Sequence, residues 1–364
     1  MMSWYPDHPA IYDINQSYAA NAEKGPFFSG EIPSRPPSSK SVDFLGFSLR
    51  SPLGVPAGPL LNSRWIELAS KLGFDLLVYK TIRSFAHPGH MLPNMIFVEP
   101  KSEKLAKALN EMPKDLSHLS VTNSFGMPSK SPDFLLQDIG RAKACLEEGQ
   151  KLIVSVVGTP TQGLSFCEDF VRAAILAKEA GAEIIEANFS CPNVDKTEGC
   201  LYMSAETVKQ FASAIVKAIA PIPLILKVGV FEQRSVLKDV LIAAAKAGVR
   251  GIAGINSVSM QVQDDEGKPA LGPNRLSSGI CGACIRKQAL HFIREASFIN
   301  AEEKLHLTLL GCGGIMKPNH FDQFLDAGAT IAMSATGMMW DPYLALRWHK
   351  KTASKNSRIV GWSG

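Results

Sequence analysis

The chain has 364 residues, of which 46% are hydrophobic, and its 38 basic and 34 acidic residues give a net charge of +4. This length and apolar content can bury one large core, which excludes a mainly disordered chain. The two signs of charge are interspersed, without the basic surface that nucleic-acid binding needs. We therefore expect a small-molecule partner and no nucleic acid.

Two further bulk features indicate a soluble, cytoplasmic protein. No stretch reaches the roughly 18 uninterrupted apolar residues of a membrane span, and the N-terminus does not read as an apolar signal. Seven cysteines form an odd set spread along the chain, which favours a reducing compartment. Cys281 and Cys284 form a single C-x-x-C pair without a second one, so we expect packing there and no metal site.

The first 42 residues are expected to form an arm before the folded domain. They contain several aromatic residues and end in a proline- and serine-rich segment, 33–39, which is typical of an extended arm or loose helix followed by a linker. One domain is expected over 43–350, and residues 351–364 are expected to be a C-terminal tail.

From residue 53 onward, short apolar runs alternate with amphipathic stretches. The runs predict eight strands and the stretches predict helices between most of them. Strands that are apolar on both faces require helices on both sides, which favours a closed parallel (β/α)8 barrel of the TIM type. The predicted strands are 53–57, 76–80, 152–157, 183–187, 224–228, 251–255, 307–310 and 330–333, and the predicted helices are 62–72, 166–180, 205–219, 233–247, 285–298 and 318–327.

The position of the glycines favours the barrel over a doubly wound open sheet. An open sheet usually carries a phosphate-binding fingerprint after its first strand, but the turn there is Ala57-Gly58-Pro59-Leu60. Glycines occur late, in Gly311-Cys312-Gly313-Gly314 and Ser334-Ala335-Thr336-Gly337, after the seventh and eighth predicted strands. Barrel enzymes often bind phosphate with these two loops. A tight turn without a ligand is the alternative.

The longest segment between predicted strands follows the second one. It contains Asn123-Ser124-Phe125-Gly126-Met127-Pro128 and two short strand-like pieces, 95–98 and 119–121. An insertion of this length at the C-terminal face of a barrel is expected to fold over the mouth. We therefore predict a cap over about 82–150 that helps to shape a substrate pocket.

Polar residues end the predicted strands, where they should all face the top of the barrel. Amides match the donors and acceptors of a pyrimidine-like ring, and a lysine at the end of an apolar strand requires an anionic or electron-rich partner. The alternatives are helix capping for any single asparagine and a structural ion pair for Lys227. The set is Lys80, Asn188, Lys227 and Asn256, with Asn123 from the cap and Cys191 and Asn193 from the loop after strand four.

The loop after the fourth predicted strand is the strongest candidate for a catalytic group. Its sequence, Asn188-Phe189-Ser190-Cys191-Pro192-Asn193, places one thiol between two primary amides. Such a thiol can remove a proton from a planar heterocycle that the amides hold. The alternative is an ordinary loop with an unreactive cysteine, because reactivity depends on surroundings that a sequence does not show.

Taken in order, these motifs resemble the dihydroorotate dehydrogenase family, most closely its soluble class 1A type. The resemblance covers about residues 44–350, and it depends on the ordered set more than on any single motif. The motifs are Val78-Tyr79-Lys80-Thr81, residues 123–128 and 188–193, Leu226-Lys227-Val228, Ile255-Asn256-Ser257, Gly311-Cys312-Gly313-Gly314-Ile315 and Ala327-Gly328-Ala329.

The resemblance implies an FMN-dependent barrel that oxidises dihydroorotate to orotate in pyrimidine biosynthesis. Cys191 would remove the C5 proton while the C6 hydride passes to flavin N5, and Lys227 would lie beside flavin N1 and O2. The substrate residues that it implies are Lys80, Asn123, Phe125, Gly126, Met127, Asn188, Asn193, Asn256 and Ser257. The cofactor residues that it implies are Ala57, Gly58, Lys80, Thr81, Asn123, Asn188, Lys227, Ser257, Gly279, Gly313, Gly314, Ser334 and Ala335.

One stretch departs from the family pattern. The class 1A type carries an arginine-containing segment after the lysine of strand two, whereas this chain has His87-Pro88-Gly89-His90-Met91-Leu92-Pro93-Asn94. The missing arginines would lie near the active-site loop, so this difference bears on the identity of the substrate and of the electron acceptor. For these the resemblance implies dihydroorotate and a soluble acceptor such as fumarate. A homodimer is also expected from the resemblance.

Three other functions remain open from the sequence. A dihydropyrimidine dehydrogenase-like barrel would use FMN on a related base and would need no carboxylate contact. A phosphate-sugar isomerase or aldolase barrel would keep the late glycines without flavin. A catalytically idle barrel would bind ligand without turning it over.

Overall fold

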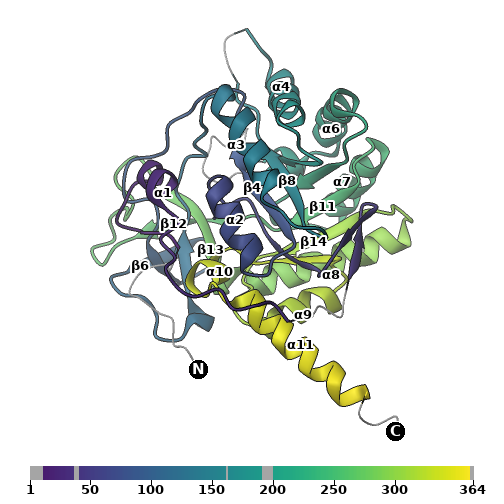
Figure 1. Cartoon of the computed structure of the whole chain (residues 1–364). Coiled ribbons are helices and arrows are strands. Elements are labelled where there is room, and N and C mark those ends of the chain that lie inside the picture. Colours follow the sequence, from purple (N-terminus) through teal and green to yellow (C-terminus); the bar gives the residue numbers. More distant parts are fainter. Residues whose placement is uncertain (1–10, 37–40, 161–162, 191–199, 361–364) are drawn as a thin grey trace.

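The computed structural model describes residues 11–36, 41–160, 163–190 and 200–360 (Figure 1). Its centre is a closed barrel of eight parallel strands, which confirms the predicted fold class. All eight predicted strands are present within a few residues of the expected bounds. In barrel order they are β3 (Leu53–Val55), β4 (Leu76–Ile82), β8 (Lys151–Val156), β9 (Ile184–Asn188), β10 (Leu224–Lys227), β11 (Gly251–Gly254), β14 (Thr308–Cys312) and β15 (Ile331–Met333).

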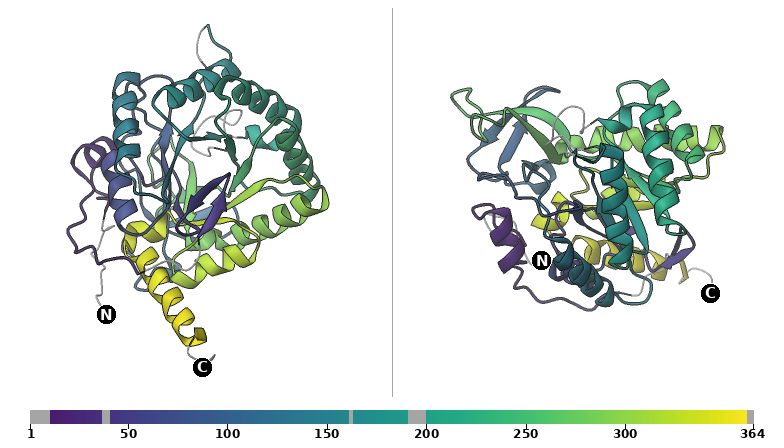
Figure 2. Two further views of the ribbon diagram at one scale, coloured as in Figure 1. Left: turned by 45° about the vertical axis from the view of Figure 1, so that its right-hand side comes forward. Right: turned by 90° about the horizontal axis from the view of Figure 1, so that it is seen from above.

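Helices surround the barrel as a ring (Figure 2, left). Four of them begin with a side-chain cap: Asn62, Ser131 and Ser204 each accept a backbone N–H of the first turn, and Ser165 forms a capping box with Glu168. The helices are α2 (Ser63–Lys71), α3 (Pro132–Ala144), α4 (Phe166–Glu179), α6 (Ala205–Ile219), α7 (Arg234–Lys246), α8 (Arg286–Glu302), α9 (Pro318–Asp326), α10 (Thr336–Trp340) and α11 (Leu344–Val360), with short 3-10 turns η1 (Leu116–His118), η2 (Leu201–Met203) and η3 (Ala283–Ile285).

Alternation along the strands separates the inside of the barrel from its helix-covered outside. In β4, Leu76 and Val78 pack into the interior cluster, whereas Leu77 and Tyr79 pack outward. The hairpin of β1 (Val42–Phe44) and β2 (Phe47–Leu49) closes one end, where Phe44 joins the same interior cluster. The other end is therefore the one left for a ligand.

A second, smaller barrel covers that other end. Its five strands close in the order β12-β13-β7-β5-β6, and they stand to one side of the helix ring (Figure 2, right). The strands are β5 (Phe97–Pro100), β6 (Leu105–Leu109), β7 (Ser120–Thr122), β12 (Val258–Gln263) and β13 (Ser277–Gly282). The predicted cap segment supplies the first three. The β12–β13 hairpin, which was not predicted from the sequence, comes from the connection after the sixth barrel strand.

The N-terminal arm packs against the barrel through buried side chains. It contains α1 (Tyr18–Lys24), and Ile11, Tyr12 and Tyr18 are buried in the main core. Further along, Arg35 donates two hydrogen bonds, of 2.6 and 2.7 Å, to the buried carboxylate of Asp75. The division of the chain into arm, barrel and tail stays a prediction, but these contacts tie the arm closely to the barrel.

The last helix runs away from the body of the molecule toward the C-terminus (Figure 1). Its first turns are docked by two side chains: Trp348 Nε1 donates to Asp322 Oδ1 at 2.8 Å, and His349 Nε2 lies 2.8 Å from the carbonyl oxygen of Gly73. Over the described ranges, every helix falls short of the length and apolar character that crossing a bilayer would require.

Candidate active site

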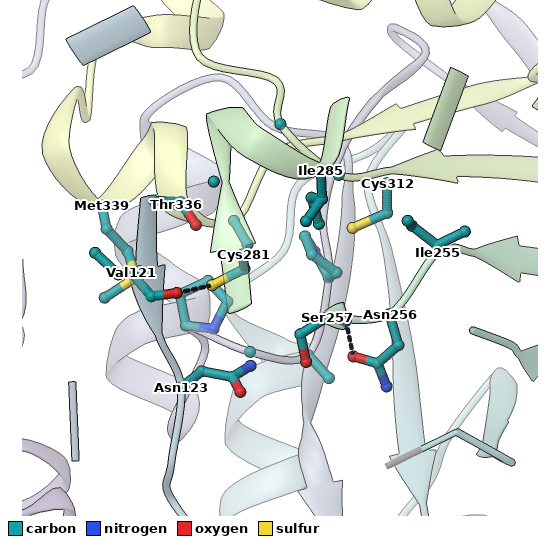
Figure 3. A pocket seen from close by; sticks show the side chains of 18 of the residues that line it. Val121, Asn123, Ile255, Asn256, Ser257, Cys281, Ile285, Cys312, Thr336 and Met339 are labelled. Atoms are coloured by element: carbon teal, nitrogen blue, oxygen red, sulfur yellow. Dashed lines mark hydrogen bonds between the residues drawn. The ribbon is translucent and has the colours of Figure 1, made fainter. Parts of the chain in front are cut away.

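A cavity, partly open to solvent, lies between the mouth of the barrel and the cap. Figure 3 shows Asn123, Asn256 and Ser257 along one edge and the thiols of Cys281 and Cys312 on either side of Ile285. A concave, partly enclosed space with a few converging polar groups is typical of a ligand or cofactor site. Its lining includes Ala57, Gly58, Lys80, Thr81, Asn123, Phe125, Met127, Glu186, Asn188, Lys227, Asn256, Ser257, Cys281, Cys312, Gly313, Gly314, Ala335, Thr336 and Gly337.

A β-bulge places two adjacent residues of β4 in this cavity. The pairing of β4 with β8 shifts between Tyr79, opposite Val154, and Ile82, opposite Val156, so that β4 has one residue more than β8 there. In a regular strand Lys80 and Thr81 would point to opposite faces, but the extra residue lets both line the cavity. Lys80 is 8% exposed, and the Thr81 hydroxyl is 3.0 Å from that of Ser155.

The two strand-end amides on the far side of the cavity are linked to one another. Asn256 Nδ2 donates to Asn188 Oδ1 at 3.2 Å and also contacts the carbonyl oxygen of Ser190. Asn188 Oδ1 also accepts the backbone N–H of Ser190 at 3.3 Å. These bonds fix which amide atoms remain for a ligand, so the pair presents a defined hydrogen-bonding edge.

The cap contributes a tight turn, 123–128, over the same space. Gly126 (φ +74°) and Met127 (φ +48°) are both in the left-handed region. The N–H groups of these two residues form no hydrogen bond with any described residue, although both residues are buried. Buried N–H groups without partners are suited to bind an anionic oxygen.

The floor of the cavity carries a buried cation and a buried anion. Lys227 is 5% exposed and forms no salt bridge with a described residue, while Glu186 is 1% exposed and its Oε2 has no hydrogen-bond partner in the described part of the chain. Burial raises the pKa of the Cys312 thiol, and the nearby ammonium of Lys227 opposes that rise. A buried ammonium without a salt bridge and a buried carboxylate oxygen without a hydrogen bond are both suited to contact a polar ligand in the cavity.

The loops after β14 and β15 form a cradle of backbone groups on another side of the cavity. Gly313 (φ +130°) and Gly314 (φ +73°) adopt conformations that favour glycine, and a Cβ on Gly314 would lie 2.4 Å from Cβ of Arg286. Among the described residues, none accepts a hydrogen bond from the N–H groups of Gly314, Ile315, Thr336 or Gly337. This arrangement has the character of a phosphate-binding site.

Most of the predicted site residues come together here, with three exceptions among the described ones. Gly126 lies within the turn but does not line the cavity, and Gly279 lies behind Asn123, whose N–H donates to the Gly279 carbonyl oxygen at 3.0 Å. The Ser334 hydroxyl is fully buried and donates to the carbonyl oxygen of Ile315 at 2.8 Å. Cys191 and Asn193 lie outside the described residues.

Several lining residues were missed by the sequence analysis. Glu186 could have been found, because it lies two residues before Asn188 in the same strand and so shares its face. Cys281 reaches the cavity from β13, where its thiol lies 3.5 Å from the Val121 carbonyl oxygen and burial raises its pKa to about 12 (Figure 3). Nothing in the local sequence indicates that position. No group of residues able to hold a metal ion occurs in the described ranges.

The fold and the site define a (β/α)8-barrel enzyme with a phosphate cradle on the loops after its last two strands. A sequence profile of the family described as dihydroorotate dehydrogenase matches residues 39–351. The dihydroorotate dehydrogenase of Dictyostelium discoideum is 46% identical over 96% of this chain and 98% of its own length. The chain therefore belongs to the dihydroorotate dehydrogenase family.

More distant relatives include NAD-dependent enzymes. The catalytic subunit of dihydroorotate dehydrogenase B (NAD(+)) from Endomicrobium trichonymphae is 26% identical over 83% of this chain and 87% of its own length. The NAD-dependent dihydropyrimidine dehydrogenase subunit PreA of Escherichia coli (strain K12) is also 26% identical, over 82% of this chain and 68% of its own length. The sequence identity to the Dictyostelium discoideum enzyme is much higher, so that similarity carries the most weight in assigning the family.

The family is flavin-dependent, and the described residues fit a phosphorylated flavin. The cradle at Gly313 and Gly314 has no room for a side chain, which leaves its backbone exposed to the cavity, and its N–H groups are available to a phosphate. Lys227 offers a cation, and Ser257, whose buried hydroxyl has no described partner, offers a hydrogen bond within the same cavity. The donor set therefore matches a ligand with a phosphate at one end and a polar ring system at the other.

Proposed function

We propose that this chain oxidises dihydroorotate to orotate with FMN as its cofactor. The observation that carries the proposal is the convergence of Lys80, Lys227 and the amides of Asn123, Asn188 and Asn256 on one covered cavity beside a phosphate cradle. Membership of the dihydroorotate dehydrogenase family supports the same reaction. The reaction is one step of pyrimidine biosynthesis.

Each end of the substrate has its own set of groups in this proposal. Lys80 and the free N–H groups of Gly126 and Met127 bind the carboxylate, because an ammonium and unbonded buried amides both favour an anion. The amides of Asn123, Asn188, Asn193 and Asn256, with Ser257, hold the C=O and N–H edge of the pyrimidine ring.

Cys191 is the proposed base that takes the proton from C5. At the usual thiol pKa near 8.5, about a few per cent of it is thiolate at pH 7. The rate of reduction should therefore rise from neutral toward alkaline pH. FMN supplies the acceptor, at flavin N5, for the hydride that leaves C6.

The cofactor is proposed to lie across the mouth with its phosphate in the cradle. Gly313, Gly314 and Ala335 hold the phosphate through backbone groups, and Ser334 supports the loop through its bond to Ile315. Lys227 would lie beside N1 and O2, where its ammonium would favour the negative charge of the reduced ring. The remaining proposed contacts are Ala57, Gly58, Lys80, Thr81, Asn123, Asn188, Ser257 and Gly279.

The test is anaerobic mixing of the purified protein with L-dihydroorotate while the visible flavin band is followed. The parent protein should bleach. Cys191→Ala should stay yellow and be reduced very slowly, whereas Cys167→Ala, whose thiol lies on the outer helix α4, should bleach like the parent. A colourless protein would favour an isomerase or aldolase barrel, and flavin that no dihydropyrimidine reduces would favour an idle one.

A dihydropyrimidine dehydrogenase-like activity is the second candidate, because the PreA relative matches most of this chain. Such a substrate has no carboxylate. Comparing orotate with uracil as ligands separates the two functions, since Lys80 and the turn at Gly126 and Met127 should favour orotate strongly. A preference for uracil would overturn the proposed substrate.

The acceptor, the assembly and the compartment also belong to this proposal. Resemblance to the class 1A type supports a soluble acceptor such as fumarate, a homodimer and a cytoplasmic location. Reoxidation of the reduced protein by fumarate but not by NAD, together with sedimentation of the purified chain, would test the first two. Fractionation of cells would test the third.

A further inference from the structure

Arg83 is a buried arginine immediately after β4. It belongs to none of the sequence motifs described above and does not line the cavity. Its side chain is 3% exposed. Nε donates to the carbonyl oxygen of Met127 at 3.1 Å, and the backbone N–H donates to Ser129 Oγ at 3.1 Å. One residue therefore holds the cap turn at two points, directly behind the cavity.

The turn needs such support because its backbone is in an unfavourable region. A non-glycine residue in the left-handed region costs about 1 kcal/mol or more, and Met127 has φ +48°. Gly126 is confined as well, since a Cβ there would lie 2.5 Å from the His90 ring. A strong donor on the Met127 carbonyl stabilises the conformation in which the N–H groups of Gly126 and Met127 stay unbonded.

Arg83 is itself fixed to the main barrel. Its Nη1 donates to Thr159 Oγ1 in the connection after β8. The N–H of Thr159 in turn donates to the buried carboxylate of Asp169, at 2.7 Å on Oδ2. The guanidinium therefore links the turn in the cap to the main barrel through hydrogen bonds at both ends.

The charge of Arg83 also bears on the departure at 87–94. Burial lowers the pKa of both histidines there, and nearby arginines lower it further, Arg83 for His87 and Arg275 for His90. The stretch is therefore neutral at pH 7. A guanidinium stays protonated throughout the accessible pH range, so the positive charge beside the turn comes from Arg83 and Arg275 and not from the two histidines.

We propose that Arg83 is the positioning residue for the substrate carboxylate. By bonding the Met127 carbonyl, it keeps the N–H groups of Gly126 and Met127 available to the carboxylate and adds a fixed positive charge behind them. The inference rests on the proposed function and deepens it, because it names the group that sets the preference for an acid over the same ring without a carboxylate.

The test compares orotate and uracil, which share the ring and differ in the carboxylate. Their binding to the flavin-loaded protein is measured by titration calorimetry, with flavin content and thermal unfolding recorded for each variant. Arg83→Gln should weaken orotate about 10- to 100-fold, the range expected for losing a hydrogen bond from a charged donor. Uracil affinity should change less than about threefold, and Arg83→Lys should restore part of the orotate affinity.

Arg275→Gln is the matched comparison. Its guanidinium also reaches the turn, at the Ser124 hydroxyl (3.2 Å), but it bonds no backbone group of Gly126 or Met127. We expect a smaller loss of orotate affinity than for Arg83→Gln. If Arg83→Gln does not fold, Thr159→Val decides, because it removes the anchor of Arg83 and leaves the turn intact.

The outcomes separate this inference from the function it rests on. Equal losses for orotate and uracil, or an unchanged orotate affinity in Arg83→Gln or Thr159→Val, would overturn the role of Arg83. A parent protein that neither binds orotate nor bleaches with dihydroorotate would overturn the proposed function instead.

Discussion

Removing the guanidinium of Arg35 should destabilise the whole protein, because its partner is a fully buried carboxylate. Asp75 has no exposed side-chain surface, and Arg35 bonds both of its oxygens in a parallel pair, of 2.6 and 2.7 Å. Breaking a buried ion pair from one side costs about 3–5 kcal/mol, because the remaining charge stays buried. Arg35→Met is the appropriate change, since it keeps much of the apolar stem.

The other partners of Asp75 place the expected loss at the lower end of that range. Ser51 Oγ donates to Oδ2 at 2.5 Å, and Arg50 Nε lies 3.6 Å from Oδ1. We therefore expect Arg35→Met to lower the free energy of unfolding by about 3 kcal/mol. Urea denaturation followed by fluorescence and by circular dichroism measures it.

Two further variants make the result specific. Lys71→Met removes an exposed pair with Glu67 on α2 and should cost less than about 0.5 kcal/mol. In Asp75→Asn, the further loss caused by Arg35→Met should be much smaller than in the parent. A loss below about 1 kcal/mol for Arg35→Met in the parent would refute the reasoning, because a fully buried carboxylate that loses its two-bond cationic partner should lose more stability than that.

Three other changes test the site and the packing around it. Gly314→Ala should weaken FMN binding at least about tenfold, since its Cβ would meet Arg286 in a left-handed turn, whereas Gly140→Ala, with open space around its Cβ, should keep full flavin content. Lys227→Gln should lower the flavin midpoint potential by about 30–60 mV, because the variant would lose a charged hydrogen bond to the reduced ring. Spectroelectrochemistry measures this potential, and an unchanged value would contradict the proposed contact. Burial, and to a lesser extent the charge of Arg35, lowers the pKa of His349 from 6.5 to about 4. As pH falls from 7 to 4, the unfolded chain therefore binds a proton at this histidine before the folded chain does, which destabilises the parent. His349→Gln lacks this effect, so its free energy of unfolding should fall by about 3 kcal/mol less than that of the parent over the same pH range. Equal losses in urea denaturation at the two pH values would contradict this last expectation.

The barrel could be predicted from the sequence because its strands are apolar on both faces. A run such as 152–157 has no polar side to place in water, which leaves a helix-covered parallel sheet as the natural arrangement. The β12–β13 hairpin was overlooked although 258–263 alternates apolar and polar residues, as a half-exposed strand does. Its place in the cap depends on pairing with β6 and β7, which lie far away in the chain.

Site residues at the ends of barrel strands could be predicted from the sequence. The features of the site that depend on tertiary contacts could not be predicted in this way. Lys80, Asn188 and Lys227 follow from the rule that barrel strands end at the mouth. Thr81 was predicted through the family resemblance, whereas the bulge that brings it beside Lys80 is a property of the pairing between two strands, and no local signal indicates that bulge. Arg83 was missed for the same reason, since its partners are brought to it by the cap.

The roof over the site is a closed ring of strands, and this limits how ligands can come and go. A strand at an open edge can peel away alone, but β12 pairs with both β13 and β6, and β7 pairs with both β13 and β5. Removing either of these strands from the ring would break ladders on two sides at once. An opening that detaches a single strand is therefore unfavourable, and the amide hydrogens of the roof should exchange with solvent nearly as slowly as those of the central strands.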